Sequence, residues 1–258
     1  MEVLDLRNIN WNNLTSTSPG MVPKYIDSNK FYKLSSYNEL VGFYGTEPIY
    51  EELAFYIGKS SGINVVKTDT FRAKIVYNGK YYETLVSISP NFSQNKQYFP
   101  IEKYCLVNNL MTLDLFKSHY SSELFKILIF DFIINNKDRH GRNIELNEWE
   151  VAPCFDNSFS FCSKIEDSQL NPKLYQDYTA NNYIGYPNLY KNLELIFNPP
   201  ELNLNKKDIF KIIDNWSIKY NISATRTKFI KNLIEYRVNI VNNKLYNVAK
   251  FTWEWVQC

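Results

Sequence analysis

An apolar run that leads straight into a polar loop constrains this chain more than any other stretch. Residues 121–134 begin Ser-Ser-Glu, continue almost wholly apolar and end Phe-Ile-Ile. The opening residues can cap a helix, and a helix that is apolar on every side must be buried in a core. The next nine residues, 135–143, are polar apart from one glycine. The sequence therefore predicts a buried helix that ends at a loop rich in charged and amide side chains.

Two side chains of this loop, Asp138 and Asn143, lie five residues apart. Kinase catalytic loops have this Asp-x-x-x-x-Asn spacing, in which the Asp accepts or orients the substrate hydroxyl and the Asn holds a magnesium ion. A second carboxylate must reach the same ion, because Mg²⁺ prefers hard oxygen ligands. Residues 144–151 alternate like two short strands around a turn at 147–148, and such a hairpin brings Asp156 beside Asn143. The pair alone is a common loop pattern and is not specific.

A longer motif around this loop is more specific. The motif Asn136-x-Asp138-x-His140-x-x-Asn143, followed by Pro153-x-Phe-Asp156, resembles the catalytic and metal loops of HipA-like protein kinases, including the CtkA-type kinases. The Asp-Arg-His order is also similar to that of phosphatidylinositol 3- and 4-kinases, which are distantly similar to this group in fold. The resemblance implies an α+β, two-lobed protein-kinase-like fold. The N-lobe would be a small antiparallel sheet with one helix, and the C-lobe would be mainly helical.

The resemblance also implies ATP and Mg²⁺ as cofactors and assigns roles within the loop. Asp138 would orient the attacking hydroxyl, and Asn143 and Asp156 would hold the metal. His140 belongs to the same catalytic loop, and we interpret it as a packing and hydrogen-bonding residue that shapes the loop. Arg139 and its neighbour Arg142 either contact phosphate or pair with acidic residues, and the sequence leaves both options open.

A Ser/Thr-rich turn at residues 15–26 contains Gly20 and is followed by Lys24. A loop of this kind can hold phosphates through backbone N–H groups and a lysine, but composition alone favours an ordinary surface turn. The resemblance makes Gly20 and Lys24 cofactor-binding candidates, because HipA-like kinases have a short glycine-containing loop and a lysine at about this position. It also implies autophosphorylation of that loop, with Ser16, Thr17 and Ser18 as candidates.

A strand at residues 30–35 carries Lys33, the candidate for the lysine that neutralises nucleotide phosphates. On its own it would be a solvent-facing strand lysine, and the family pattern gives it this role. Residues 46–62 then predict an amphipathic helix with Thr46 as its cap. We favour Glu51 of this helix as the partner of Lys33, by its spacing within the family pattern. If Glu51 faces solvent, the electrostatics of a helix start explain it.

The strand pattern and the helix pattern divide the chain near residue 92. Two alternating segments flank Asn78-Gly79, the strongest short signal for a hairpin, and Pro90 is expected to end the second strand at the hinge between lobes. We predict an N-lobe over residues 1–92 and a C-lobe over 93–258. The polar segment 163–200 suits a substrate-facing region or an irregular surface connection. Two helices, Lys206–Tyr220 and Ala224–Val248, are expected to be structural.

Composition excludes several other classes of protein. The chain has 258 residues, 45% of them hydrophobic and 16% aromatic, which is enough for a real core. Its net charge of +2 gives no broad field for nucleic acid, and its four cysteines lack a Cys-x-x-Cys pair for zinc. It has neither a signal-like start nor an apolar run of about eighteen residues. We therefore expect a cytoplasmic protein that binds neither nucleic acid nor a membrane.

Three functions remain open at this stage. The first is an ATP- and Mg²⁺-dependent serine/threonine protein kinase that autophosphorylates, for which the family implies a toxin or growth-regulating role. The protein-kinase hypothesis implies a protein substrate, and either an antitoxin or a separate amino-terminal subdomain as a partner. The second is a kinase for a lipid or small molecule, because the Asp-Arg-His order is shared with lipid kinases. The third is a nucleotide-binding pseudokinase that acts as a scaffold.

Overall fold

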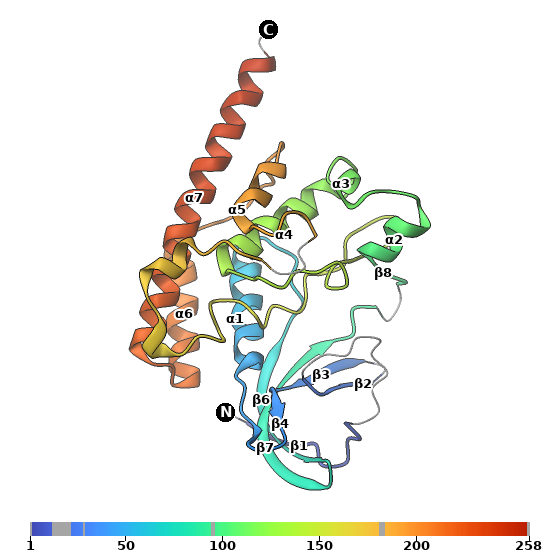
Figure 1. Cartoon of the computed structure of the whole chain (residues 1–258), viewed down its shortest axis with the longest axis vertical. Helices are drawn as coiled ribbons and strands as arrows, with labels where there is room; N and C mark the ends of the chain where they lie inside the picture. Colours follow the sequence, from blue (N-terminus) through green and yellow to red (C-terminus); the bar gives the residue numbers. More distant parts are fainter. Residues whose placement is uncertain (1, 12–21, 28, 94–95, 181–183, 257–258) are drawn as a thin grey trace.

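The computed structural model describes residues 2–11, 22–27, 29–93, 96–180 and 184–256. A small sheet forms one end of the molecule and helices form the other (Figure 1). This is the predicted α+β architecture. Within the described residues, no helix combines the length and the apolar character needed to cross a membrane.

Five strands form the main sheet in the order β1-β6-β7-β3-β2. They are β1 (Val3–Asp5), β2 (Lys24–Ile26), β3 (Lys30–Leu34), β6 (Asp69–Tyr77) and β7 (Lys80–Pro90). The neighbours pair antiparallel except β1, which lies parallel to β6 and had no signal in the sequence. Asn78 and Gly79 turn the β6–β7 hairpin with φ of 49° and 73°, the left-handed values that this tight turn requires. A separate ribbon, β4 (Tyr37–Asn38) and β5 (Gly42–Phe43), packs beside β7.

Strand β7 ends at Pro90, as predicted, and includes the proline as its last residue. Pro90 lies opposite Lys30 of β3, whereas the pairing of β7 with β6 stops at Ile88. At Pro90 the strand is therefore locally an edge, and a proline is tolerated there because no second neighbour needs its missing N–H group.

Helix α1 (Glu47–Ser60) starts after Thr46 and stops before Gly62, in agreement with the prediction, although the Thr46 side chain makes no capping hydrogen bond. Its buried face packs into the large hydrophobic core that also contains the C-terminal helices. The sheet has a small core of its own, made by Trp11, Leu34, Ala73, Ile75 and Val86. The boundary at residues 92 and 93 stays a prediction, but the packing shows that α1 shares a core with helices far beyond it.

Polar contacts fasten α1 to α6 (Lys206–Tyr220) as well. The Trp216 indole donates a hydrogen bond to the Ile49 carbonyl at 2.8 Å. Glu52, which is buried, accepts from the Lys219 ammonium at 2.6 Å and from the Tyr220 hydroxyl at 2.7 Å. These contacts hold one turn of α1 against α6, and Thr70 of β6 holds the same turn against the sheet by donating to Glu52 and to the Pro48 carbonyl, both at 2.8 Å.

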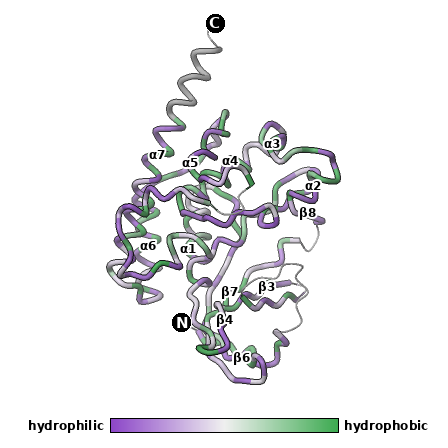
Figure 2. The backbone as a smooth tube through the Cα atoms, viewed as in Figure 1, coloured by the Kyte–Doolittle hydropathy of each residue, from purple (hydrophilic) through white to green (hydrophobic). Residues whose placement is uncertain are grey.

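Helix α4 (Ser121–Ile134) lies at the centre of the helical part and is buried from Leu124 onward apart from Lys126, as predicted. Figure 2 shows it among hydrophobic stretches surrounded by more hydrophilic loops. Its N-cap is Tyr120 and makes no side-chain capping bond, so the predicted serine cap was wrong. The helix ends at Asn135, whose φ of 56° turns the chain out of the helix and into the polar loop.

The other helices surround α4. They are α2 (Ile101–Val107), α3 (Thr112–Leu115), α5 (Leu189–Asn192) and α7 (Ala224–Val256), with three short 3₁₀ helices at Asp167–Gln169, Pro172–Gln176 and Leu193–Leu195. Helix α6 has its predicted bounds, and α7 continues to Val256 rather than ending at Val248. The described residues of the segment 163–200 form short helices and one isolated bridge between Thr179 and Asn188, in keeping with its polar and irregular sequence.

The hairpin predicted after the polar loop is present in a reduced form. Strand β9 (Glu145–Leu146) pairs with β8 (Phe99–Pro100), and only a single bridge joins Leu146 to Val151. The turn spans residues 147–150, not 147–148, because the Asn147 side chain accepts hydrogen bonds from the next backbone N–H groups at 2.9 and 3.0 Å. The chain nevertheless reverses, and the Ala152 N–H donates to the Glu145 carbonyl at 2.8 Å.

Candidate active site

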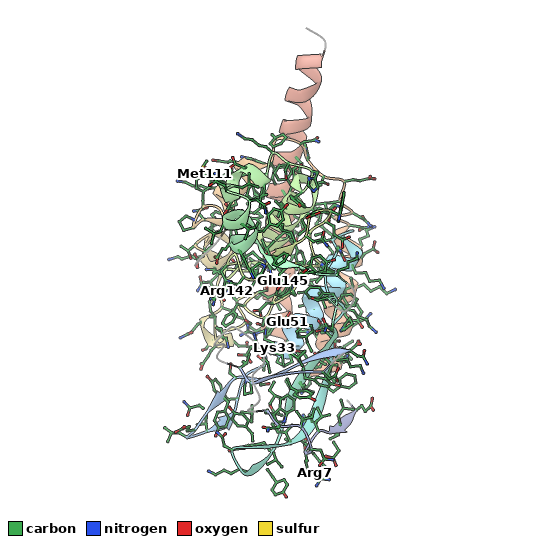
Figure 3. The ribbon with its side chains drawn as sticks, turned by 90° about the vertical axis from the view of Figure 1, so that its right-hand side faces the viewer. Arg7, Lys33, Glu51, Met111, Arg142 and Glu145 are labelled. Carbon is green, nitrogen blue, oxygen red and sulfur yellow. The ribbon has the colours of Figure 1, made fainter. Side chains whose placement is uncertain are left out.

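A cavity of about 380 Å³ lies where the sheet meets the helical part. The sheet contributes Lys24, Phe31 and Lys33, and α1 contributes Glu51. The loops on the helical side add Arg142, Asn143, Glu145, Phe155 and Asp156. Figure 3 shows Lys33 and Glu51 in the middle of the molecule, between the sheet at one end and the helices at the other. Side chains from three parts of the chain thus converge on one cavity.

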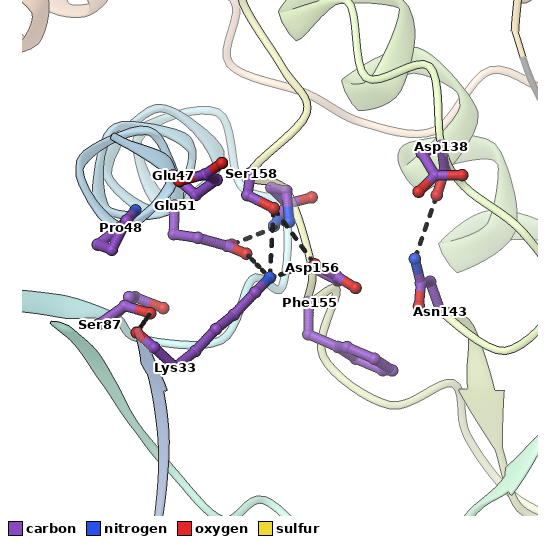
Figure 4. Close-up of polar contacts among 12 residues, drawn as sticks. Lys33, Glu47, Pro48, Glu51, Ser87, Asp138, Asn143, Phe155, Asp156 and Ser158 are labelled. Carbon is purple, nitrogen blue, oxygen red and sulfur yellow. Dashed lines mark hydrogen bonds and ion pairs between the residues drawn. The ribbon is translucent and has the colours of Figure 1, made fainter. Parts of the chain in front are cut away.

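Lys33 is the centre of the polar contacts in this cavity (Figure 4). Its ammonium group lies 3.0 Å from Glu51 Oε1, pairs with the Asp156 carboxylate and donates to Ser158 Oγ at 3.2 Å. Burial alone would lower the pKa of Lys33, but the Asp156 and Glu51 carboxylates outweigh burial and raise it. Lys33 is therefore a permanent cation at this site, and the predicted ion pair with Glu51 is present.

Asp156 lies directly after Phe155 in an unusual backbone conformation, with φ of 57°. Non-glycine residues rarely adopt this left-handed region, although aspartate tolerates it better than most. Burial would raise the pKa of Asp156, but the positive charges of Lys33 and Lys24 keep it well below its ordinary value. The side chain is therefore an ionised carboxylate that faces the cavity.

Lys24 of β2 lies directly across from Lys33 of β3 in the strand register. Burial lowers the pKa of Lys24, and the nearby Lys33 charge lowers it further. Two lysines thus line the sheet side of the cavity, and the carboxylates of Glu51 and Asp156 lie against Lys33. Gly20 and the candidate residues Ser16, Thr17 and Ser18 lie outside the described residues.

Asn143 is buried, and its side-chain nitrogen donates a hydrogen bond to the Asp138 carbonyl oxygen at 3.1 Å. This bond fixes the amide with its nitrogen toward the loop backbone and its oxygen facing the other way. Because Asn143 also lines the cavity, its oxygen is placed to accept a hydrogen bond or to coordinate a cation there. The two predicted metal ligands, Asn143 and Asp156, therefore border the same cavity.

Among the described residues, neither Asp138 nor His140 lines the cavity. Asp138 is next to it, because its carbonyl accepts the hydrogen bond from Asn143, which does line the cavity. Burial is the main cause of the raised pKa of Asp138. His140 acts in the opposite direction and lowers this pKa, whereas the nearby Asp156 charge raises it. His140 Nδ1 is buried without a hydrogen-bond partner in the described part of the chain, whereas its carbonyl accepts from the Asn143 N–H at 2.9 Å. His140 therefore contributes to the shape of the loop through the hydrogen bond of its backbone carbonyl, and its Nδ1 adds none within the described residues.

The sequence interpretation missed one residue at this site and left the role of another open between two options. Ser158 donates and accepts within the Lys33 and Asp156 cluster, and no motif marked it. Arg139, whose role the sequence left open, is fully buried and paired with Asp131 of α4. A signal for this pair existed, because Asp131 is an acidic residue in an otherwise apolar helix, and a buried charge needs a partner.

Comparison with known proteins places this geometry in a known fold. No protein-family model matches the chain, and no curated protein matches it. Among solved structures, the crystal structure of the Helicobacter pylori proinflammatory kinase CtkA is similar, with a TM-score of 0.64 and 16% sequence identity. The match covers 96% of this chain and 99% of CtkA. At this identity the similarity shows the fold, and the chain therefore has the two-lobed kinase-like fold that its catalytic-loop motif predicted.

Proposed function

We propose that this chain is an ATP- and Mg²⁺-dependent protein kinase that transfers phosphate to serine or threonine hydroxyls. The observation that carries the proposal is the cluster of Lys33, Glu51 and Asp156 in one cavity. In protein kinases a strand lysine that pairs a helix glutamate binds the nucleotide phosphates, and an aspartate beside it holds metal. The similarity of fold to the Helicobacter pylori kinase CtkA supports the proposal.

The nucleotide base would occupy the apolar end of the cavity. Phe31, Phe92 and Phe155 line this end, with ring centroids 6.2 Å apart for Phe31 and Phe92 and 5.4 Å apart for Phe92 and Phe155. Aromatic faces of this kind stack on a flat base, and a volume of about 380 Å³ is within the usual range for a small-molecule site. The phosphates would then extend toward Lys24 and Lys33.

Asn143 and Asp156 fit a magnesium site by their chemistry. Both present oxygen atoms to the cavity, and the low pKa of Asp156 keeps it charged. The described residues contain no group of three or more His, Cys, Asp and Glu side chains that could hold a metal by themselves. This agrees with Mg²⁺, which takes much of its coordination from phosphate and water and, when bound, would neutralise charge on the transferred phosphate.

Asp138 is proposed to orient the substrate hydroxyl and accept its proton. Burial raises the pKa of its carboxyl, which makes it more basic, the direction that proton transfer needs. The terminal phosphate of ATP would pass to the hydroxyl oxygen and ADP would leave. Positioning and charge neutralisation supply most of the catalysis in such a reaction.

Transfer of label from ATP tests the proposal. Purified protein is incubated with γ-³²P-ATP and Mg²⁺, with a generic protein substrate in one tube and mixed lipids in another. We expect label on protein with the wild type and none with Asp138→Ala. Label only in lipid would support a lipid kinase instead. Nucleotide binding without any transfer would support a pseudokinase. Mass spectrometry of the labelled chain would then test the expected autophosphorylation.

A further inference from the structure

We infer that Arg139 is a positioning residue that sets the two proposed metal ligands, Asn143 and Asp156, relative to one another. This inference rests on the proposed function. Arg139 follows the proposed catalytic aspartate, but its side chain points into the protein and is fully buried. It contacts substrate nowhere in the proposed mechanism and acts through the groups that it holds.

Asp131 of α4 anchors the guanidinium group of Arg139. Arg139 Nε donates to Asp131 Oδ2 at 3.0 Å, and Nη2 donates to Asp131 Oδ1 at 2.9 Å. Both side chains have no exposed area, and Asn136 also donates to Asp131 at 3.1 Å. Such a two-point bond fixes the plane of the guanidinium group as well as its position. The remaining N–H groups therefore point in fixed directions.

Those N–H groups hold the residues on both sides of Asp156. Nη1 donates to the Phe155 carbonyl, and Nη2 donates to Asn157 Oδ1 at 2.5 Å. The Asn157 backbone N–H in turn donates to Glu51 Oε2 at 2.9 Å, which ties the segment to α1. Asp156 itself has the left-handed φ of 57°, a conformation that persists when its surroundings fix it. Clamping the residues before and after it is a direct way to do so.

The same Nη1 atom also reaches the catalytic loop, 3.4 Å from the Asn143 carbonyl. A single guanidinium group thus touches the backbone of one proposed metal ligand and both neighbours of the other. Lysine carries the same charge but has one compact ammonium group and cannot make this set of planar contacts. The structure therefore assigns to Arg139 a geometric role that charge alone does not supply.

The experiment measures Mg²⁺-dependent nucleotide binding, which does not depend on catalysis. Thermal shift with ATP is recorded while Mg²⁺ is titrated, and TNP-ATP binding in EDTA is recorded separately. We expect Arg139→Lys and Asn157→Ala to raise the half-saturating Mg²⁺ concentration about ten-fold or more, the usual effect of losing support around a metal ligand. Binding of TNP-ATP in EDTA should stay as in the wild type.

Arg237→Lys is the matched control. Arg237 is equally buried, but it donates to the carbonyls of Phe132 and Asp177, away from the cavity. Its replacement should lower the melting temperature and leave the Mg²⁺ dependence unchanged. If Arg139→Lys does not fold, Asn157→Ala decides alone, because it keeps the pair of Arg139 and Asp131. The inference is overturned if the folded variants need no more Mg²⁺ than the wild type. A wild type without Mg²⁺-dependent binding overturns the proposed function as well.

Discussion

Removing the Lys33 side chain tests whether the polar cluster at the cavity holds the two parts of the molecule together. In Lys33→Met, the carboxylates of Glu51 and Asp156 lose their shared cation. The side chains of Lys33, Glu51 and Asp156 are 16%, 8% and 24% exposed, so solvent replaces little of the lost attraction. Breaking a buried ion pair by removing one partner costs about 3–5 kcal/mol, and the residual exposure favours the lower end. For a domain of this size, about 3 kcal/mol lowers the melting temperature by about 6–12 °C.

The pH dependence of this difference follows from the two pKa shifts. The pKa of Asp156 is below its ordinary value, so its contribution to stability is present above about pH 4 and is lost as the pH falls further. The pKa of Lys33 is raised, so its contribution is present up to about pH 10 and is lost only as the pH rises above that. The difference in melting temperature should therefore be full between about pH 5 and 9 and narrow below about pH 4.

Thermal unfolding followed by circular dichroism without ligand measures this difference. Lys206→Met is the matched control, since Lys206 pairs with Glu235 at 3.1 Å with both side chains about half exposed. A pair of that kind is worth about 0.5 kcal/mol, or about 1–2 °C. If Lys33→Met at pH 7 costs no more than this control, the cluster does not stabilise the contact between sheet and helices and the reasoning is refuted.

Three further predictions concern other parts of the molecule. Leu53→Ala, in the buried face of α1, should lower the free energy of unfolding by about 2–5 kcal/mol, measured by urea titration. A single unfolding transition in that titration is expected because α1 and the C-terminal helices share one core, and two separate transitions would contradict this. Burial raises the pKa of Asp138, so the rate of phosphate transfer should fall on acidification at a higher pH than an ordinary aspartate would give. A pH–rate profile that matches a free aspartate would contradict the role of this carboxyl as the proton acceptor. The thiol of Cys154 is buried, and that burial raises its pKa to about 12. Iodoacetamide should therefore label Cys154 only after denaturation. Peptide mapping that finds Cys154 labelled in the native protein would disprove this.

Local signals in the sequence were sufficient for several elements of the fold. Asn78-Gly79 predicted the β6–β7 hairpin because a turn with two left-handed residues has few other solutions. The apolar run of α4 predicted its burial, since no exposed helix tolerates such a composition. The pairing of Lys33 with Glu51 was accessible only through the family motif, because strand and helix meet by tertiary packing.

Contacts between distant segments were beyond the sequence alone. The parallel pairing of β1 with β6 joins residues near 3 and near 73, and three residues carry too short a pattern to predict a partner. Membership of α1 in the C-terminal core depends on Trp216 meeting Ile49, and on Lys219 meeting Glu52, across the molecule. The inward direction of Arg139 depends on Asp131 of α4, and the sequence interpretation made no use of this acidic residue in a largely apolar helix.

Calorimetric titration of ATP into the protein, with Mg²⁺ and with EDTA, tests the central claim most directly. The claim is that a nucleotide and its metal lie in the cavity that Lys33 and Asp156 line. We expect the wild type to bind ATP with Mg²⁺, and Asp156→Asn to weaken that binding at least about ten-fold, because the ionised oxygen ligand is lost. A wild type that releases no heat with ATP and Mg²⁺, or an Asp156→Asn variant that binds as the wild type does, would contradict the account.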